Sequence, residues 1–304
     1  MRKTRLVIGI FTILSLLAYL ILGCSHPSLP GTFVDDSGRV VNIDKTPQRI
    51  ISHMPGITDI LFALGLDEKV VGVGEYCDYP EAAKTKPKVG GFSTPSMEKI
   101  VALDPDLVLT NGSVEYVMTG LDSLGITYII LQPKDIDGIL KNIELVGKVT
   151  GTQKKSEELI ANLRERISYV TSRVKDARRP KVFYTFATTD LNNPWTAGPG
   201  SFVDSLITMA GGENIGAKAS APWAQFSIEE VISSDPEVII VDASMGSAVT
   251  PIDKLKQHPI WQEMTAVKQD KIYRINGDLV NRPGPRIVQG LEEMAKIIHP
   301  ELFE

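Results

Sequence analysis

The sequence is poor in the residues that enzymes and metal proteins use for chemistry. It contains only two cysteines and four histidines in 304 residues. The histidines are scattered, and none has a partner at the spacing of a zinc site. The residue pattern therefore predicts no metal site. The four are His26, His53, His258 and His299.

The motifs of common catalytic and nucleotide-binding sites are also absent. There is no Gly-x-Ser-x-Gly turn and no His-Glu-x-x-His pair. Gly72-Val73-Gly74 lacks the third glycine of a dinucleotide-binding loop. We therefore expect neither an enzyme nor a bound cofactor. An α/β enzyme or a metal-centre protein on a nitrogenase-component-like fold, which would need clustered cysteines or a nucleotide loop, is kept as the alternative from a different class.

Negative charge is in slight excess, with 37 acidic and 32 basic residues. The formal net charge is −5, and adjacent basic residues occur only as pairs, such as Arg178-Arg179. These two arginines fit the end of a helix, where they complement its dipole. Because nucleic-acid-binding proteins usually carry a basic patch or stripe, we expect no nucleic-acid partner.

The longest apolar run lies at the N-terminus. Arg2, Lys3 and Arg5 precede an almost wholly apolar stretch from Leu6 to Leu22. This order is typical of a secretory signal, so residues 1–23 are predicted to be a signal peptide. A run of about 17 residues is near the lower limit for a membrane span, and an uncleaved anchor is the alternative.

The end of that run, Ile21-Leu22-Gly23-Cys24, resembles a bacterial lipobox. The resemblance implies cleavage before Cys24 and attachment of a lipid to it. The protein would then be exported and held on the extracytoplasmic side of a membrane, with residues 24–31 as a tether. Cys77 would be left without a partner for an intrachain disulfide.

A repeat organises the rest of the chain. Ser96-Met97-Glu98 recurs as Ser227-Ile228-Glu229, and in both copies an acidic-Pro-acidic-apolar run follows. The copies are 131 residues apart, which is the size of a domain rather than of a solenoid repeat. The repeat predicts two similar lobes, each with one glutamate, Glu98 or Glu229, at the start of a helix.

Short apolar strands alternate with helical segments, which favours an α/β fold with mostly parallel sheets. The longest helical pattern runs from about Thr152 to Ala177 and would be about 39 Å long at 1.5 Å per residue. Because it lies midway between the repeat copies, it is predicted to join the lobes. The expected domains are residues 32–150, an interlobe helix at 151–179 and residues 180–304.

Several aromatic residues fall in loops between predicted elements and are candidate ligand contacts. Flat rings at strand ends offer apolar area to a large ligand, although any single ring could instead cover the edge of a lobe. Trp261 lies on a predicted helix and is expected in the core. The four loop aromatics are Tyr76, Phe92, Trp195 and Trp223.

Three polar residues are further candidates. His53 ends the first buried strand, at the edge where open α/β sheets bind ligands, but a loop histidine with satisfied ring nitrogens is the alternative. Asp278 and Arg282 are four residues apart in a Pro/Gly-containing loop. Arg282 is a good bidentate partner for ligand oxygens, or the two residues could pair with each other.

Several motifs resemble those of the substrate-binding proteins of ABC importers for cobalamin, haem and ferric siderophores. The resemblance covers the whole mature chain. It implies two Rossmann-like lobes joined by one long helix, with the ligand in the cleft between them. The motifs are the two Ser-x-Glu copies, Tyr76-Cys77-Asp78-Tyr79-Pro80, Gly211-Gly212-Glu213-Asn214-Ile215, Trp223 to Glu229 and Arg282-Pro283-Gly284-Pro285-Arg286.

The resemblance also implies partners. The acids that match Glu98 and Glu229 dock onto arginines of the two permease subunits, and a two-fold permease presents the same basic site twice. The partners would be an ABC permease dimer with its ATPase subunits, and the binding protein itself would be monomeric.

Within the family, the chain is most similar to the cobalamin-binding members. Their cleft aromatics correspond to Tyr76 and Trp223, and their Asp-x-x-x-Arg pair corresponds to Asp278 and Arg282. Asn111 stands where the enterobacterial type has an aromatic residue. The expected ligand is cobalamin or another corrinoid. Ferric siderophore or haem is the alternative, in which His53 or Tyr76 would ligate haem iron.

Overall fold

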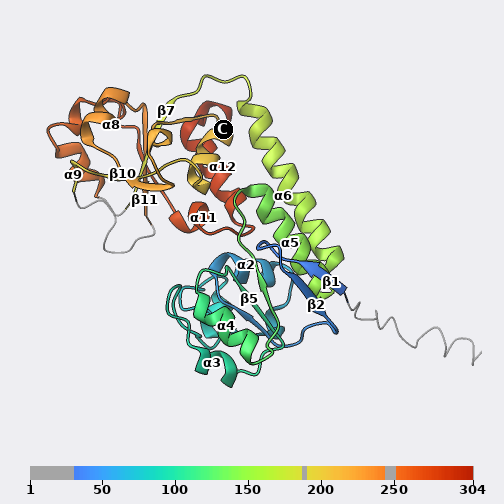
Figure 1. Cartoon of the computed structure of the whole chain (residues 1–304). Helices are drawn as coiled ribbons and strands as arrows, with labels where there is room; N and C mark the ends of the chain where they lie inside the picture. The colour runs from blue at the N-terminus through green and yellow to red at the C-terminus, as the bar shows by residue number, and fades with distance from the viewer. Residues whose placement is uncertain (1–30, 187–189, 244–250, 304) are drawn as a thin grey trace, which may run out of the picture.

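The computed structural model describes residues 31–186, 190–243 and 251–303, which form two lobes joined by a long helix (Figure 1). The predicted signal peptide and Cys24 lie outside the described residues. The first strand, β1 (Gly31–Val34), begins one residue inside the predicted tether.

The N-terminal lobe is built on a parallel four-stranded sheet with the order β4-β3-β5-β6. Its strands are short and buried, and alternate residues face opposite sides. Leu107 and Leu109 pack towards α2 and α5, whereas Val108 packs towards α3 and α4. The elements are β3 (Ile50–Ser52), β4 (Val70–Val73), β5 (Leu107–Thr110), β6 (Tyr128–Ile130), α2 (Pro55–Ala63), α3 (Met97–Ala102), α4 (Glu115–Ser123) and α5 (Ile136–Thr150).

The C-terminal lobe repeats this arrangement. Its main sheet has the order β9-β7-β11-β12, so that in both lobes the first strand lies between the second and the third. One face packs on α7 and α12, and the other on α8, α9 and Trp261. The elements are β7 (Lys181–Thr185), β9 (Glu213–Asn214), β11 (Val238–Asp242), β12 (Ile272–Ile275), α7 (Phe202–Met209), α8 (Ile228–Ser234), α9 (Ile252–Gln257), α10 (Thr265–Lys268), α11 (Gly277–Asn281) and α12 (Ile287–Ile298).

Two segments differ from the sequence prediction. The helix predicted to hold Trp261 is interrupted after α9, because Pro259 disfavours helical backbone at His258 and removes an N–H donor. Trp261 then lies in a separate 3₁₀ turn and is fully buried, as expected for a core residue. The loop expected over residues 278–285 contains the short helix α11.

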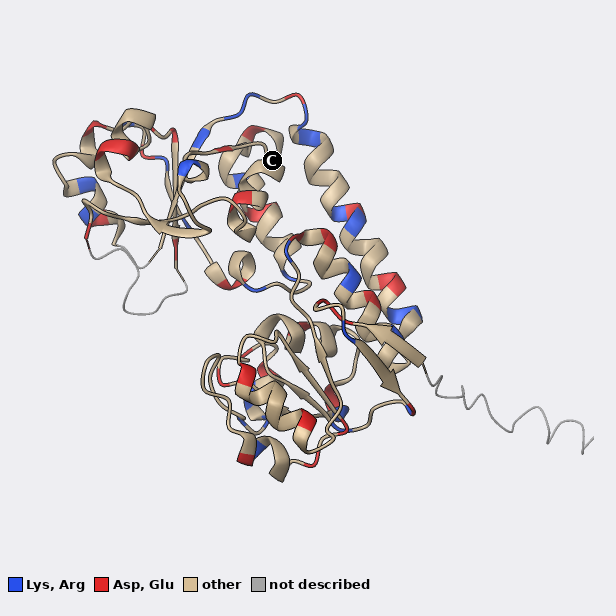
Figure 2. Ribbon diagram, viewed as in Figure 1, with Lys and Arg blue, Asp and Glu red and all other residues tan. Residues whose placement is uncertain are grey.

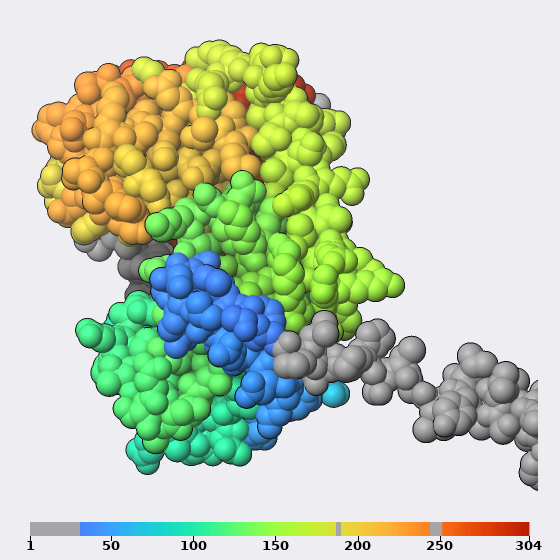
Figure 3. Space-filling model, turned by 45° about the vertical axis from the view of Figure 1, so that its right-hand side comes forward, coloured from blue at the N-terminus to red at the C-terminus, as the bar shows by residue number. Residues whose placement is uncertain are grey.

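The helix α6 (Gln153–Val174) runs along both lobes and joins them (Figures 1 and 3). At one end it crosses α5 so closely that a Cβ on Gly147 would lie 2.1 Å from the Ser156 hydroxyl oxygen. Further along α6, Arg166 makes a bidentate ion pair with Glu292 of α12, with N–O distances of 2.8 and 2.7 Å. One apolar cluster continues from the first sheet through these helices into the second lobe.

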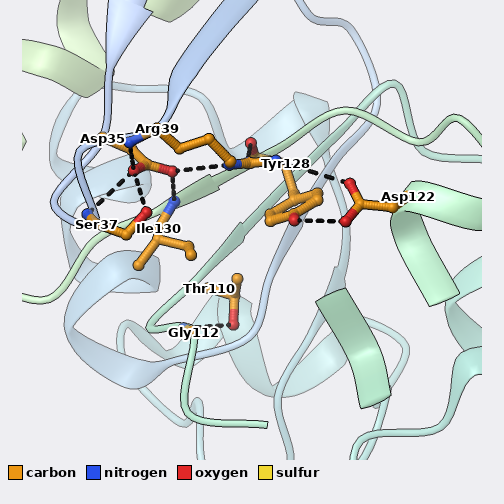
Figure 4. Close-up of polar contacts among 8 residues, drawn as sticks. All are labelled: Asp35, Ser37, Arg39, Thr110, Gly112, Asp122, Tyr128 and Ile130. Atoms are coloured by element: carbon orange, nitrogen blue, oxygen red, sulfur yellow. Dashed lines mark hydrogen bonds and ion pairs between the residues drawn. The ribbon is translucent and has the colours of Figure 1, made fainter. Parts of the chain in front are cut away.

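A hairpin of β1 and β2 (Val40–Ile43) closes the outer edge of the first lobe, where the buried carboxylate of Asp35 organises it (Figure 4). Asp35 accepts hydrogen bonds from the backbone N–H groups of Ser37, Arg39 and Ile130 at 3.0–3.2 Å. Burial alone would raise the pKa of Asp35, but these donors and the Ser37 hydroxyl hold it below its usual value.

This network predicts an acid-dependent contribution to stability. The folded pKa of Asp35 lies below the ordinary value of 3.8, so the unfolded chain binds the proton more readily. The stabilisation is therefore complete above pH 3.8 and is lost as the pH falls through the folded pKa. Asp35→Asn is expected to lower the free energy of unfolding by about 1–3 kcal/mol at neutral pH, and this gap should narrow in acid.

Urea unfolding at several pH values measures the difference in the free energy of unfolding between the wild type and Asp35→Asn. Asp44→Asn is the control, because Asp44 is exposed just after β2 and its replacement should change the free energy of unfolding by less than about 0.5 kcal/mol. If Asp35→Asn lowers the free energy of unfolding by the same amount at neutral and acidic pH, the ionised Asp35 carboxylate is not the source of the stabilisation.

Candidate functional site

A pocket lies between the lobes, where the carboxyl ends of both parallel sheets meet. Phe92, Asn111 and Gln132 come from loops of the first lobe, and Asn281 and Arg282 come from the second. Its volume of about 160 Å³ is below the roughly 300–1,000 Å³ of typical ligand pockets. It therefore suits one group of a larger ligand. The lining is Met54, Pro55, Gly56, Ile57, Ile60, Phe92, Asn111, Leu131, Gln132, Pro133, Asn142, Asn281, Arg282 and Pro283.

The first lobe presents two aromatic rings beside this pocket. Tyr76 and Phe92 stack with their centroids 4.5 Å apart and their planes 28° from parallel. Although stacked, both rings remain largely exposed, at 49% for Tyr76 and 42% for Phe92. Both of these predicted residues therefore form a flat apolar surface that faces solvent.

The second lobe presents an aromatic group of its own. Strands β8 (Trp195–Ala197) and β10 (Trp223–Gln225) pair antiparallel, which places Trp195 and Trp223 on one face. Phe186 packs against both rings, with centroids 6.1 Å from Trp195 and 5.1 Å from Trp223. Sequence reasoning missed Phe186. Its position directly after β7, which matches that of His53 after β3, is the signal that could have identified it.

A buried polar network connects this aromatic group to the pocket. Tyr184, whose ring centroid lies 6.3 Å from that of Phe186, donates its hydroxyl hydrogen to Asp242 at 2.6 Å. Asn281, which lines the pocket, donates its Nδ2 hydrogens to Asp242 at 2.8 Å and to the Tyr184 hydroxyl at 3.2 Å. Burial raises the pKa of Tyr184 well above its usual value, so the hydroxyl stays protonated. None of these three residues was predicted.

The amide of Asn281 has one unused group. Its Oδ1 is buried and accepts no hydrogen bond within the described residues. Leaving a buried acceptor without a donor costs about 1–3 kcal/mol. A ligand donor that reached this atom would remove that cost.

The structure places the predicted residue His53 beneath the pocket surface. His53 is 4% exposed, its Nε2 lies 3.1 Å from the Gly91 carbonyl oxygen, and its Nδ1 lies 3.4 Å from the Thr110 hydroxyl. Burial lowers its pKa, which favours the neutral ring. Because both ring nitrogens are engaged, the predicted ligand contact is replaced by a supporting role under the loop that carries Phe92.

The predicted pair of Asp278 and Arg282 also has a different arrangement from the expected cleft cation. Arg282 Nη2 contacts Asp278 at 2.8 Å, and Nη1 contacts Asp78 of the other lobe at 2.5 Å. Burial alone would raise the pKa of Asp78, but the hydrogen bond from Arg282 holds the pKa of this carboxyl below its usual value. With both ends of its guanidinium engaged, Arg282 is a bridge between lobes rather than a free cation.

A second bridge lies next to the first. Arg286 Nε contacts Asp59 at 2.7 Å, and its guanidinium lies 3.7 Å from the ring centroid of Tyr79. Burial raises the pKa of Asp59 to about 6, although Arg286 opposes the shift. The backbones approach closely here, since a Cβ on Gly56 would lie 2.3 Å from the Pro283 carbonyl oxygen. The two lobes therefore contact each other directly.

Glu98 and Glu229 occupy equivalent places on α3 and α8. Each follows a serine N-cap, Ser96 or Ser227, whose side chain accepts a backbone hydrogen bond. Both glutamates are exposed, and the described residues contain no ion pair to either. The two helices lie at opposite ends of the molecule, and acidic residues are visible on both (Figures 1 and 2).

The described part of the chain lacks two further features. It contains no group of three or more metal-ligating side chains and no helix with the length and apolarity needed to cross a bilayer. Cys77 is a free, buried cysteine, and burial raises its pKa to about 11. A thiol with so high a pKa is unreactive at neutral pH.

Comparison with known proteins gives consistent matches. A family model described as periplasmic binding protein matches residues 50–279. An uncharacterized ABC transporter substrate-binding lipoprotein of Bacillus subtilis (strain 168) is 30% identical, and the match covers 97% of this chain and 98% of the relative.

Two solved structures share both the fold and a similar level of identity. The periplasmic vitamin B12 binding protein of Vibrio cholerae is 28% identical, with a TM-score of 0.71 over 84% of this chain and 97% of that chain. The periplasmic heme-binding protein of Roseiflexus sp. RS-1, in its apo form, is 28% identical, with a TM-score of 0.75 over 83% and 98% of the two chains.

Proposed function

The chain belongs to the periplasmic binding protein family, and from that premise we propose that it captures a corrinoid, such as cobalamin, between its lobes. It is a substrate-binding protein of an ABC transporter and not an enzyme, and it works outside the cytoplasm with a permease and an ATPase. The identity of the ligand is the proposed part.

One observation carries the proposal. Each lobe presents exposed aromatic rings: Tyr76 and Phe92 lie beside the interlobe pocket, whereas Trp195 and Trp223 are connected to it through Phe186, Tyr184 and Asn281. Two such surfaces suit a large, flat and partly apolar ligand that contacts both lobes. The corrin ring has these properties, and a vitamin B12 binding protein is among the structural neighbours.

Charge favours a corrinoid over the other family ligands. Haem and ferric catecholate siderophores bring negative charge, which would require free cations in the cleft. Arg282, the cation that lines the pocket, is already paired with Asp78 and Asp278. Haem remains the second candidate, because Tyr76 is exposed and a haem-binding protein is also a structural neighbour.

We also propose that Cys24 carries a lipid that anchors the protein to the membrane. The support is the lipobox-like sequence Ile21 to Cys24 and the lipoprotein name of the Bacillus relative. Metabolic labelling with a fatty acid tests it, because Cys24→Ala should abolish incorporation of the label.

Isothermal titration calorimetry with a ligand panel tests the main proposal. The mature protein is titrated with cyanocobalamin, cobinamide, haemin and a ferric hydroxamate. We expect tight binding of the two corrinoids and weak or no binding of the other two. Heat and thermal stabilisation from haemin or the ferric chelate, with none from any corrinoid, would overturn the assignment.

A further inference from the structure

The polar lining of the interlobe pocket is dominated by carboxamide side chains. Asn111, Gln132 and Asn142 come from the first lobe, and Asn281 comes from the second. Among the described residues that line the pocket there is no carboxylate, and the one cation, Arg282, is held by Asp78 and Asp278. The described lining is therefore polar but carries no unpaired charge.

Neighbouring residues set the orientation of two of these amides. Asn142 is 2% exposed, and its Nδ2 donates to Asp36 at 2.9 Å. Asn281 directs its Nδ2 to Asp242 and Tyr184. Because carboxylates accept hydrogen bonds only, each amide must turn its nitrogen to the acid and keep its oxygen for another donor. Both of these lining residues thus keep an amide oxygen as an acceptor, and the Asn281 Oδ1 is buried without a partner among the described residues.

Asn111 is oriented the opposite way. Its Oδ1 accepts hydrogen bonds from the Ser113 backbone at 3.2 Å and from the Ser113 hydroxyl at 2.8 Å. The structure shows no acceptor for its Nδ2 among the described residues, so this nitrogen is available as a donor. The pocket therefore combines fixed acceptors with a fixed donor.

We infer that this pocket binds a primary carboxamide arm of the ligand and rejects a carboxylate at the same position. A carboxamide supplies two donors and one acceptor, which complements the amides of Asn142, Asn281 and Asn111. A carboxylate supplies acceptors only and would face the oxygens of Asn142 and Asn281 with no free cation to neutralise it. The inference rests on the proposed function, because corrinoids carry such amide arms whereas haem carries carboxylates.

Calorimetry with single-site derivatives of the ligand tests the inference. The wild-type protein is titrated with cyanocobalamin and with a series of its monocarboxylic acids, one for each peripheral amide. We expect the acid derived from the arm that enters the pocket to bind at least about tenfold more weakly, because an unpaired charge then replaces satisfied hydrogen bonds. The other acids should bind within about twofold of cyanocobalamin.

A matched pair of variants tests the pocket from the side of the protein. Asn111→Asp keeps the oxygen that Ser113 uses and replaces the donor nitrogen by a negative oxygen, so cyanocobalamin affinity should fall about tenfold. Asn42→Asp is the control, because Asn42 is exposed on β2 and its Oδ1 likewise accepts from the Thr32 hydroxyl. It should bind like the wild type, and thermal unfolding establishes that both variants are folded.

The outcomes separate the two proposals. If cyanocobalamin and every acid bind the wild type equally well, or if Asn111→Asp binds like Asn42→Asp, the carboxamide inference is wrong and the corrinoid assignment stands. If no corrinoid binds the wild type, the proposed function fails and the inference fails with it.

Discussion

Replacing Trp223 with alanine is expected to weaken cyanocobalamin binding about 30- to 150-fold. The indole is 42% exposed and is held at a fixed angle by Phe186, with ring centroids 5.1 Å apart. A ring that is already ordered loses little conformational entropy when a ligand covers it. Covering such a side chain contributes about 2–3 kcal/mol, which corresponds to that loss of affinity. Titration calorimetry measures it.

The control for Trp223→Ala is Tyr169→Ala. Tyr169 is 50% exposed on α6 and packs on Phe303, with centroids 6.2 Å apart. Its loss removes a comparable aromatic surface outside the pocket, so ligand affinity should not change. Trp223→Phe should retain most of the affinity, because a flat ring remains. A Trp223→Ala variant that binds within about threefold of the wild type would show that this ring is not part of the site.

The double variant Glu98→Ala with Glu229→Ala is expected to bind ligand normally but to lose delivery. Both glutamates are exposed on capped helices, one on each lobe, and neither lines the pocket. Exposed charges at equivalent positions suit a two-fold partner with matching basic sites. Ligand uptake by cells or by reconstituted transporter should fall by at least about tenfold, because both anchoring charges are lost.

A second double variant controls for the removal of surface charge. Glu115 and Asp253 are also exposed acids in the first turn of a helix, with one on each lobe. Glu115→Ala with Asp253→Ala should leave both binding and uptake intact. Loss of ligand binding in the Glu98/Glu229 variant would place these acids in the ligand site. Normal uptake by the same variant would show that they do not dock the protein onto the permease.

The repeat was the most reliable guide to the fold, because its signals are local in the chain. A serine cap, a Glu in the first turn and an Asp-Pro stop give similar helices wherever they occur, since each acts within a few residues. Even the left-handed aspartates before proline recur, with φ of 44° at Asp104 and 45° at Asp235. The signal for the long helix is also local in the sequence, and α6 (Gln153–Val174) lies within the range that the sequence predicts.

The polar residues of the site show what local patterns cannot predict. Arg282 reaches Asp78, which is 204 residues away in the sequence. No spacing rule connects such positions, so the ion pair with Asp78 could not be anticipated, whereas the pairing of Arg282 with Asp278 was the alternative that the sequence offered. His53 was correctly placed after a strand, but the depth of that loop below the surface depends on how Gly91 packs over it.

The sequence by itself therefore determined the two lobes, the helix between them, the exposed acids and the family. Each depends on periodicity, caps or motifs that are contiguous in the chain. Only the tertiary structure decided which polar groups are already used and which remain available, as with the paired guanidinium of Arg282 and the Oδ1 of Asn281, which has no partner in the described part of the chain. The physical reason is that a hydrogen bond or ion pair satisfies a group only at contact distance, and packing alone sets those distances between residues far apart in the sequence.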